Sequence, residues 1–366
     1  MAESNTSPSA TVTMAGPMLP PLKAAIISPW VDALCIGGGS ILVLAPLLLW
    51  GDSMMGIMSP AVQATLGVLL NTPHFMASYR IVYRSKAMMH RHPWAAFYIP
   101  ALLAAYCVFA VLTFATEPIH ISILTITASV YLAWHYTGQT WGMMASFAYL
   151  GGTPFDAKER LAIRLGLRLM LCWHVTWYFY WSNELDWVSY VAEPIYSVMC
   201  QITLVSFALG AAGIAAFVRR TRRLPPVHVL VAWASIYFWY AVMARDVRAI
   251  YWAQLAHAVQ YLIFPARVEL NNETARAGGA GRQVIEHMIW YVLILLVAAF
   301  GFELLVVSWG TQLTNGILGS KAAAVVPAAG LAFLNIHHYF TDGCVWKISN
   351  PEVRKELFAH VPQEKK

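Results

Sequence analysis

The sequence predicts an all-α, polytopic integral membrane protein with about ten transmembrane helices and both termini in the cytoplasm. The first reason is composition, because 59% of the 366 residues are hydrophobic and only 11% are charged, whereas soluble domains carry about 25% charged residues. With a mean hydropathy of +0.57, the chain has too little charge to cover a water-facing surface. These values exclude a soluble enzyme, a disordered scaffold and a nucleic-acid-binding protein, so we expect no nucleic-acid partner.

The second reason is the recurrence of apolar segments near the length that crosses a bilayer. A transmembrane helix needs about 20 mostly apolar residues. In chain order, we expect ten spans at residues 30–50, 60–83, 94–116, 121–149, 161–182, 188–217, 226–244, 248–266, 284–308 and 322–346. These spans form one transmembrane domain over residues 23–348.

The two ends of the chain are expected to lie outside that domain. Residues 1–22 are rich in Ser, Thr and Pro and have neither a basic segment nor an apolar run of a signal peptide, which predicts a disordered cytoplasmic tail. Residues 349–366 are expected to form a second cytoplasmic tail.

The third reason is the placement of basic residues, which collect in the cytoplasmic loops of membrane proteins. When the N-terminus is placed inside, all of the 24 lysines and arginines except Arg245, Arg248 and Lys321 fall on the cytoplasmic side. Lysines and arginines thus alternate between abundant and scarce in successive loops, and omitting or adding one span would destroy this alternation. The excess of basic residues behind the net charge of +6 therefore marks the cytoplasmic loops. We expect a multi-pass protein of a bacterial inner or cell membrane that contacts membrane lipids.

Half of the twelve histidines lie in apolar sequence near the middle of a predicted span. They are His74, His135, His174, His257 and the neighbouring pair His337 and His338. His74 and His257 stand ten residues before Arg84 and Arg267, and His337 has the same offset from a lysine. At 1.5 Å per residue this offset is about 15 Å, which is half of a hydrocarbon core of about 30 Å. We therefore expect these histidines to share one plane of the bilayer.

Polar side chains accompany several of these histidines at helical spacing. His74 belongs to a stripe with Asn71 and Ser78, and Tyr261 follows His257 by four residues. Glutamine or aspartate follows three of the histidines by three or four residues, at Gln139, Gln260 and Asp342. Such positions lie on one helix face, and a metal-bound imidazole needs an acceptor for its second nitrogen. We expect Gln139, Gln260 and Asp342 to be catalytic residues that orient the metal ligands or act as an additional ligand.

The histidines predict a metal site, because ionisable groups at this depth turn toward one another or toward a bound ion. His74, His135 and His257 are expected ligands, together with one of His337 and His338. The neighbouring pair points about 100° apart on a helix, so the other member is expected to be structural, and whether His174 joins the site stays open. The five cysteines have no spacing typical of zinc or iron–sulfur sites.

Imidazole with an optional carboxylate suits non-haem iron, with copper, zinc or haem as alternatives. A substrate that reaches the middle of a bilayer is lipophilic, so the leading hypothesis is a metal-dependent oxygenase or oxidase acting on a lipid or isoprenoid, with a redox partner if the reaction needs electrons. Two other functions use the same residues. One is a proton- or metal-coupled transporter, and the other is a haem-binding electron carrier.

Single histidines in the segments NTPHFMASY, WHYTGQTWG, QLAHAVQY and NIHHYFTDG resemble those of the bacterial membrane-bound β-carotene dioxygenases. The HxxxH and HxxHH boxes of membrane desaturases and hydroxylases do not occur in the sequence. The resemblance implies one iron held by isolated histidines from separate transmembrane helices. It covers only these four segments, and the carotenoid substrate is not carried over.

Overall fold

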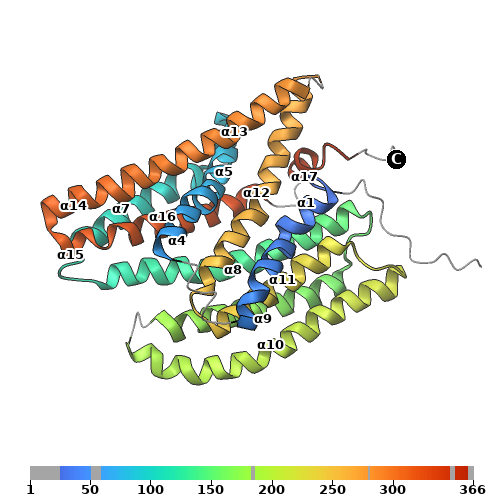
Figure 1. The fold of residues 1–366 in the computed structure, drawn as a ribbon, viewed down its shortest axis with the longest axis horizontal. Coiled ribbons are helices and arrows are strands. Elements are labelled where there is room, and N and C mark those ends of the chain that lie inside the picture. The colour runs from blue at the N-terminus through green and yellow to red at the C-terminus, as the bar shows by residue number, and fades with distance from the viewer. Residues whose placement is uncertain (1–24, 51–58, 183–185, 279–280, 347–350, 362–366) are drawn as a thin grey trace, which may run out of the picture.

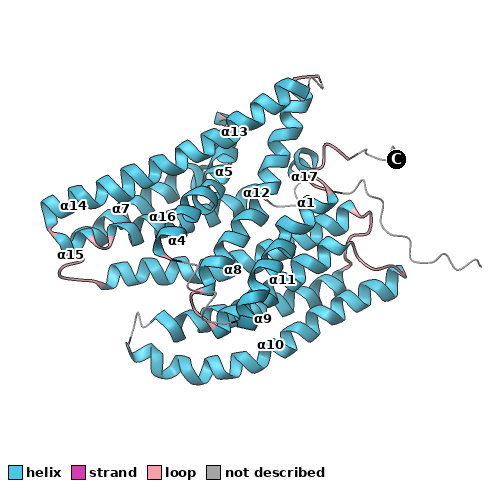
Figure 2. Ribbon diagram, in the orientation of Figure 1, coloured by secondary structure: helices cyan, strands magenta, loops and turns pink. Residues whose placement is uncertain are grey.

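In a computed structural model of the protein, all regular elements are helices. No strand occurs in residues 25–50, 59–182, 186–278, 281–346 and 351–361, which are the residues that the structure describes (Figure 2). The all-α prediction is confirmed for this part of the chain. The predicted disordered tail, residues 1–22, lies outside the described residues.

Short helical segments alternate with long ones along the chain. The first part contains α1 (Pro29–Ala33), η1 (Leu34–Gly38), α2 (Gly39–Trp50), α4 (Pro60–Leu66), η2 (Gly67–Asn71), α5 (Thr72–Tyr83), α6 (Lys86–Arg91), η3 (Trp94–Tyr98), α7 (Ile99–Thr113) and α8 (Ile119–Leu150). The second part contains α9 (Ala157–Ser182), α10 (Asp186–Thr221), α11 (Val227–Arg245), α12 (Ala249–Arg276), α13 (Gly281–Phe302), η4 (Glu303–Trp309), α14 (Gly310–Leu318), α15 (Ser320–Ala323), α16 (Val326–Val345) and α17 (Pro351–Leu357).

Six helical segments of the described chain are long and apolar enough to cross a membrane. They are Pro29–Pro46, Trp94–Thr113, Tyr190–Thr221, Val227–Arg245, Gly281–Leu318 and Ser320–Val345. Each of the ten predicted spans overlaps one helix or a run of consecutive helical segments. The structure thus supports a membrane protein with several spanning helices, while the count of ten and the orientation stay predictions.

Four of the predicted spans coincide with helices that fall short of this apolarity. They correspond to α4 with α5, to α8, to α9 and to α12. All four of these helical runs carry a mid-span histidine that is buried inside the protein, at His74, His135, His174 and His257. Their lower hydropathy therefore reflects polar side chains that face the interior of the bundle.

Helix α8 occupies the interior of the bundle, where it contacts α7, α9, α11 and α16 (Figure 1). Helix α16 also contacts α5 and α7, and α12 contacts α5, α11 and α13. The largest apolar core lies along α8, α9 and α11, where Phe147, Trp173 and Trp239 are almost fully buried. Other helices therefore cover the region where four helices meet, which are α5, α8, α12 and α16.

A sharp bend in η1 brings its backbone against α11 and α12. Gly37 has φ of +148°, and a Cβ at this position would lie 2.4 Å from Cβ of Ser235. Only glycine fits both the backbone conformation and the close approach. The bend exposes the carbonyl of Ile36, which accepts a hydrogen bond of 2.5 Å from Nε2 of Gln260.

The C-terminal segment expected to be a tail contains a short docked helix. Asn271 of α12 donates from Nδ2 to the carbonyls of Glu356 (2.8 Å) and Leu357 (3.2 Å). The side chains of Leu357 and Phe358 are each 1% exposed. Helix α17 therefore closes one end of the bundle beside α12, and residues 362–366 of the predicted tail lie outside the described residues.

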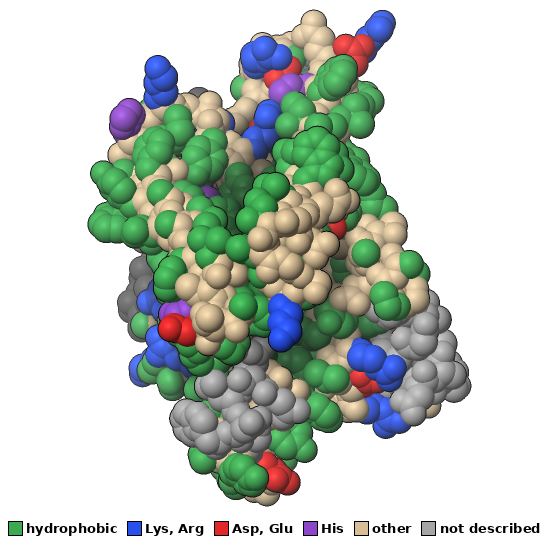
Figure 3. All heavy atoms as spheres, turned by 90° about the vertical axis from the view of Figure 1, so that its left-hand side faces the viewer, with side chains coloured by type: hydrophobic (Ala, Val, Ile, Leu, Met, Phe, Trp, Pro, Cys, Tyr) green, Lys and Arg blue, Asp and Glu red, His purple; other side chains and the backbone are tan. Residues whose placement is uncertain are grey.

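Hydrophobic side chains spread over much of the outer face that Figure 3 shows. On α13, Ile285, Ile289, Trp290 and Val297 are all more than half exposed. Soluble proteins rarely expose apolar surface in such continuous patches. This exterior is typical of a helix bundle whose solvent is lipid.

Candidate metal centre

Four helices bring one histidine each into a closed ring of imidazoles. The ring centroids lie 4.8 Å apart for His74 and His338, 4.8 Å for His338 and His135, 4.7 Å for His135 and His257, and 5.5 Å for His257 and His74. Neighbouring planes are inclined by 73° to 89°. All four side chains are buried. The common depth expected from the sequence thus corresponds to direct contact between the rings.

Several nitrogens of this ring have no hydrogen-bond partner. Nδ1 of His74 contacts the carbonyl of Asn71, and its buried Nε2 is without a partner. Both ring nitrogens of His257 are likewise buried and unpartnered. A buried polar atom without a partner costs free energy, so these nitrogens indicate a ligand.

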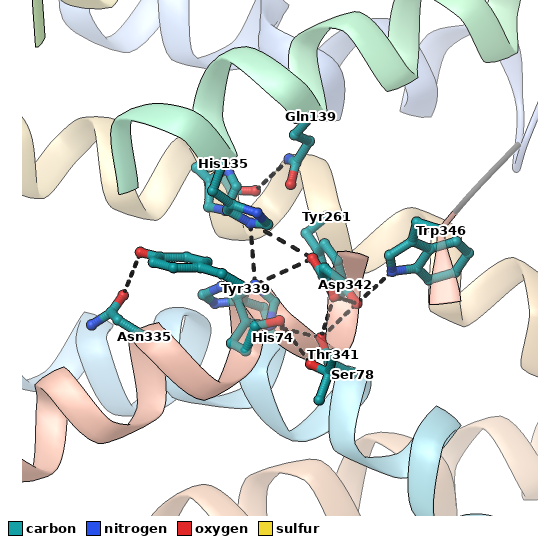
Figure 4. A network of polar contacts seen from close by, with 12 residues as sticks. His74, Ser78, His135, Gln139, Tyr261, Asn335, Tyr339, Thr341, Asp342 and Trp346 are labelled. Atoms are coloured by element: carbon teal, nitrogen blue, oxygen red, sulfur yellow. Dashed lines mark hydrogen bonds and ion pairs between the residues drawn. The ribbon is translucent and has the colours of Figure 1, made fainter. Parts of the chain in front are cut away.

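Asp342 of α16 stands directly beside the ring (Figure 4). Its Oδ1 accepts hydrogen bonds from Tyr261 Oη (2.8 Å) and Ser78 Oγ (3.0 Å). Its Oδ2 lies 3.4 Å from Nε2 of His338 and 3.6 Å from Nε2 of His135. One carboxylate oxygen is therefore held by donors, while the other faces the imidazoles.

The hydrogen bonds around His338 determine which of its nitrogens faces the site. Its Nδ1 lies 2.8 Å from Ser78 Oγ. Because the hydroxyl of Ser78 donates to Asp342, it has no second proton for His338, so Nδ1–H of His338 donates to Ser78. The lone pair of Nε2 then points toward Nε2 of His135, which is 3.2 Å away. Two nitrogens and Oδ2 of Asp342 converge, and they require a proton or a metal ion between them.

Two overlapping groups of ligand atoms fit a metal ion. One comprises His74, His257 and His338, and the other comprises His135, His338 and Asp342; within each group all ligand atoms lie within 4.8 Å of one another. Two nitrogens that each lie about 2.1 Å from one ion can be at most about 4.2 Å apart, so small inward shifts of the side chains complete the coordination. His338 belongs to both groups, which therefore lie next to each other.

His337 lies outside this ring. Its Nε2 is 2.8 Å from the carbonyl of Ala95 in η3, and its ring stacks on Tyr79 with a centroid distance of 4.8 Å. Successive residues on a helix point about 100° apart, so α16 directs His338 toward α5 and α8 and His337 toward η3. Of the predicted pair, only His338 belongs to the candidate centre.

Gln139 and Gln260 form hydrogen bonds between neighbouring helices. Nε2 of Gln139 donates to the carbonyl of His257 (3.3 Å) and to Oε1 of Gln260 (3.4 Å). Gln260 donates onward to Ile36 and Ser235. These amides connect α8, α12, η1 and α11, and Gln139 also lines the cavity that His135 and Asp342 border, so the catalytic role of the two glutamines stays a prediction.

His174 also stays outside the ring. Its Nδ1 lies 2.8 Å from Tyr240 Oη. Tyr136 stands between it and the candidate centre, with ring centroids 5.8 Å from His174 and 4.5 Å from His257. The position left open by the sequence is therefore a hydrogen-bonded histidine of the aromatic core.

Trp346 takes part in the polar network, which the sequence reasoning did not anticipate. Its Nε1 donates to Tyr261 Oη at 2.7 Å, and Tyr261 in turn donates to Asp342. Its position four residues after Asp342 places Trp346 on the same helix face, and this spacing could have identified it. An aromatic residue next to a lysine, here Lys347, is also typical of a membrane interface. The sequence therefore favoured an interfacial position for Trp346 over a place in the polar network.

A cavity of about 260 Å³ adjoins the candidate centre. His135 and Asp342 form part of its wall, and three glycines, Gly138, Gly142 and Gly343, form another part. A Cβ at any of these glycines would meet nothing within 4 Å. The wall is otherwise largely aromatic, including Tyr131, Trp134 and Tyr339, so the cavity suits an apolar chain.

Comparison of the chain with protein-family models, with curated proteins and with solved structures finds no match. The function therefore has to be argued from the geometry of the candidate centre.

Proposed function

We propose that the protein is a membrane-embedded, histidine-ligated, metal-dependent oxygenase or oxidase that acts on a lipophilic substrate. The observation that carries this proposal is the convergence of four buried imidazoles, two of them with unpartnered nitrogens, beside an apolar cavity. In this proposal His74, His135, His257 and His338 hold the metal. The chain crosses a bacterial cell membrane ten times with both termini in the cytoplasm, which places the ring near the bilayer centre.

The proposed metal is non-haem iron, because imidazole and carboxylate donors suit it and dioxygen chemistry needs an open coordination position. An ion that accepts six ligands keeps two positions beyond the four imidazoles. If both oxygen atoms enter the product, the substrate supplies all the electrons. If one oxygen leaves as water, a redox partner must supply two electrons and two protons are consumed.

The surrounding residues orient the ligands and bind the substrate. The carbonyl of Asn71 and the hydroxyl of Ser78 hold the outer nitrogens of His74 and His338, as partners of metal-bound imidazoles usually do. Asp342 is an additional ligand or a proton acceptor at Oδ2. The glycine-walled cavity admits an apolar chain from the bilayer.

A haem carrier fits this geometry less well. The porphyrin plane must lie between its two axial imidazoles, but the four rings contact one another at centroid distances of 4.7 to 5.5 Å. These contacts leave no slot for a macrocycle. Copper and zinc fit the donor set as iron does and remain alternatives.

A proton- or metal-coupled transporter is the second candidate. The hydrogen bonds of the Tyr261 and Ser78 hydroxyls to Asp342 are the observation that favours it, because hydroxyl and carboxyl groups can both accept and donate protons. A transporter releases its ion, whereas an oxygenase retains it during purification. Metal retention therefore separates the two functions.

The test is elemental analysis and absorption spectroscopy of the protein purified in detergent, followed by oxygen uptake with membrane lipid extracts. The proposal expects near-stoichiometric iron, no Soret band, and lipid-dependent oxygen uptake that is lost when His74 and His257 are both replaced by alanine. Absence of bound metal, a Soret band, or uptake that survives the double replacement would each overturn it.

A further inference from the structure

Helices α8 and α9 enclose a second, smaller cavity of about 90 Å³. Two of its wall residues are Arg164 and Arg168, which lie one turn apart on α9. Within the described residues, neither guanidinium has a carboxylate partner. Arg220 of the adjoining α10, by contrast, pairs with Glu159 at 2.6 Å.

Both arginines are exposed, and they belong to the basic residues that the predicted topology places toward the cytoplasmic side. They lie seven and eleven residues after the start of α9 at Ala157, which is about 10 and 16 Å along the helix. Their cavity is also lined by Trp134 and Gly138, which flank His135 in sequence. Exposed arginines near a membrane surface attract anionic lipid head groups.

The two cavities meet over α8. Trp134 and Gly138 belong to the walls of both. Gly138 has no side chain, and a Cβ there would meet nothing within 4 Å. At this position no side chain stands between the two cavities. One molecule can therefore lie with one end beside the arginines and the other end beside His135 and Asp342.

We infer that the substrate of the candidate metal centre is an anionic amphiphile, that is, a lipid with a carboxylate or phosphate head and an apolar chain. This inference rests on the proposed function. The head binds Arg164 and Arg168, because paired guanidinium groups match these anions geometrically, and the chain crosses Gly138 into the larger cavity.

The dimensions agree with this division of the ligand. The cavity beside the arginines, of about 90 Å³, is smaller than the cavity of about 260 Å³ beside the metal centre, which suits a head group in the first and an apolar chain in the second. From Trp141, in the wall of the smaller cavity, to His135 is six residues of α8, or about 9 Å. The part of the chain that reaches the metal centre therefore lies about 9 Å from the head.

The test measures binding of two probes to the full-length protein in nanodiscs of phosphatidylcholine, which is neutral overall. One probe is nitroxide-labelled stearic acid, and the other is its methyl ester, which has the same chain without the charge. The acid is expected to bind about tenfold or more tightly than the ester, because hydrogen bonds to charged groups are strong. Arg164→Gln with Arg168→Gln should remove this difference.

Two matched controls accompany these variants. Arg219→Gln with Arg223→Gln removes two exposed arginines near the end of α10 and should leave the preference for the acid unchanged. Gly138→Leu should weaken binding of the acid severalfold, because it places a side chain between the two cavities. Gly301→Leu, at another glycine with open space around it, should leave the binding unchanged.

A competition arm separates a lipid head group from a free anion. Inorganic phosphate at concentrations equal to those of the probe should displace little of the labelled acid, because it lacks the chain. Complete displacement by phosphate, equal binding of acid and ester, or an unchanged preference after the arginine replacements would overturn the inference.

The metal content of the same samples distinguishes the two proposals. If the wild-type protein holds no metal yet binds the acid through Arg164 and Arg168, the oxygenase proposal fails while the anionic head-group site stands. If iron is present in the wild type and in the arginine variant but the two probes bind equally, the head-group inference fails alone.

Discussion

Two buried histidine environments in this molecule look alike in the sequence and differ in the structure. His174 and His338 are each at most 1% exposed, and both lie in the middle of long apolar helices. His174 is hydrogen-bonded to Tyr240 and packs edge to face against Trp177 and Tyr240. His338 instead places its Nε2 at 3.2 Å from Nε2 of His135, in a ring where other nitrogens have no partner.

The difference shows that burial by itself does not identify a ligand. Around His174 the packing of large aromatic side chains satisfies the imidazole with a single tyrosine hydroxyl. Around His338 the outer nitrogen is satisfied by Ser78, while the inner nitrogens of several rings converge. Convergence of unpartnered lone pairs distinguishes a candidate metal centre from a structural histidine, and each prediction below tests this distinction.

The largest expected effect comes from His257→Ala. Because neither nitrogen of His257 has a hydrogen-bond partner, the substitution removes a proposed ligand without breaking a hydrogen bond. We expect nearly complete loss of metal, measured by elemental analysis, with the protein still folded by circular dichroism. Metal retained at the wild-type level would remove His257 from the centre.

Asp342→Asn should have the next largest effect. The amide oxygen can still accept from Tyr261 and Ser78, but the negative charge beside His135 and His338 is lost. We expect metal affinity to fall by about 10- to 100-fold, which is typical when a group that supports a metal site is changed. Competition with a chelator measures this, and an unchanged affinity would assign Asp342 to helix packing alone.

Ser78→Ala should have a smaller effect on the same measurement. The substitution removes the acceptor of Nδ1 of His338 and so loosens the orientation of this ring. We expect a loss of metal affinity of about tenfold. Thr341→Ala is the matched control, because the hydroxyl of Thr341 donates to a backbone carbonyl of its own helix and should leave the affinity unchanged.

His174→Phe should affect stability and leave the metal in place. The substitution leaves the buried hydroxyl of Tyr240 without its partner, which costs about 1–3 kcal/mol. We expect a lower thermal midpoint of unfolding together with an unchanged metal content. Loss of metal in this variant would contradict the separation between the two histidine environments.

His337→Asn should have the smallest effect. It removes the contact of Nε2 with the carbonyl of Ala95, which is worth about 1 kcal/mol, and it lies outside the imidazole ring. We expect a slightly lower thermal midpoint and a normal metal content, measured on the same preparations as His257→Ala.

Much of the fold and part of the candidate site could be predicted from the sequence. Counting residues from the basic end of a span places a histidine in depth, because the helical rise is constant, and this brought His74, His257 and His337 to one level. The same count could not distinguish His338 from His337 or exclude His174. It also could not show that Gln139 and Gln260 face other helices, because spacing alone does not say which side of a helix meets a neighbour.

The sequence by itself determined that this chain is helical and suited to a membrane, because these properties depend on composition and on the length of apolar runs. The tertiary structure alone decided which imidazoles touch, which nitrogens stay free, and where a cavity adjoins them. The physical reason is that depth follows from position along one helix, whereas the direction of a side chain around the helix axis acquires meaning only when neighbouring helices pack against it.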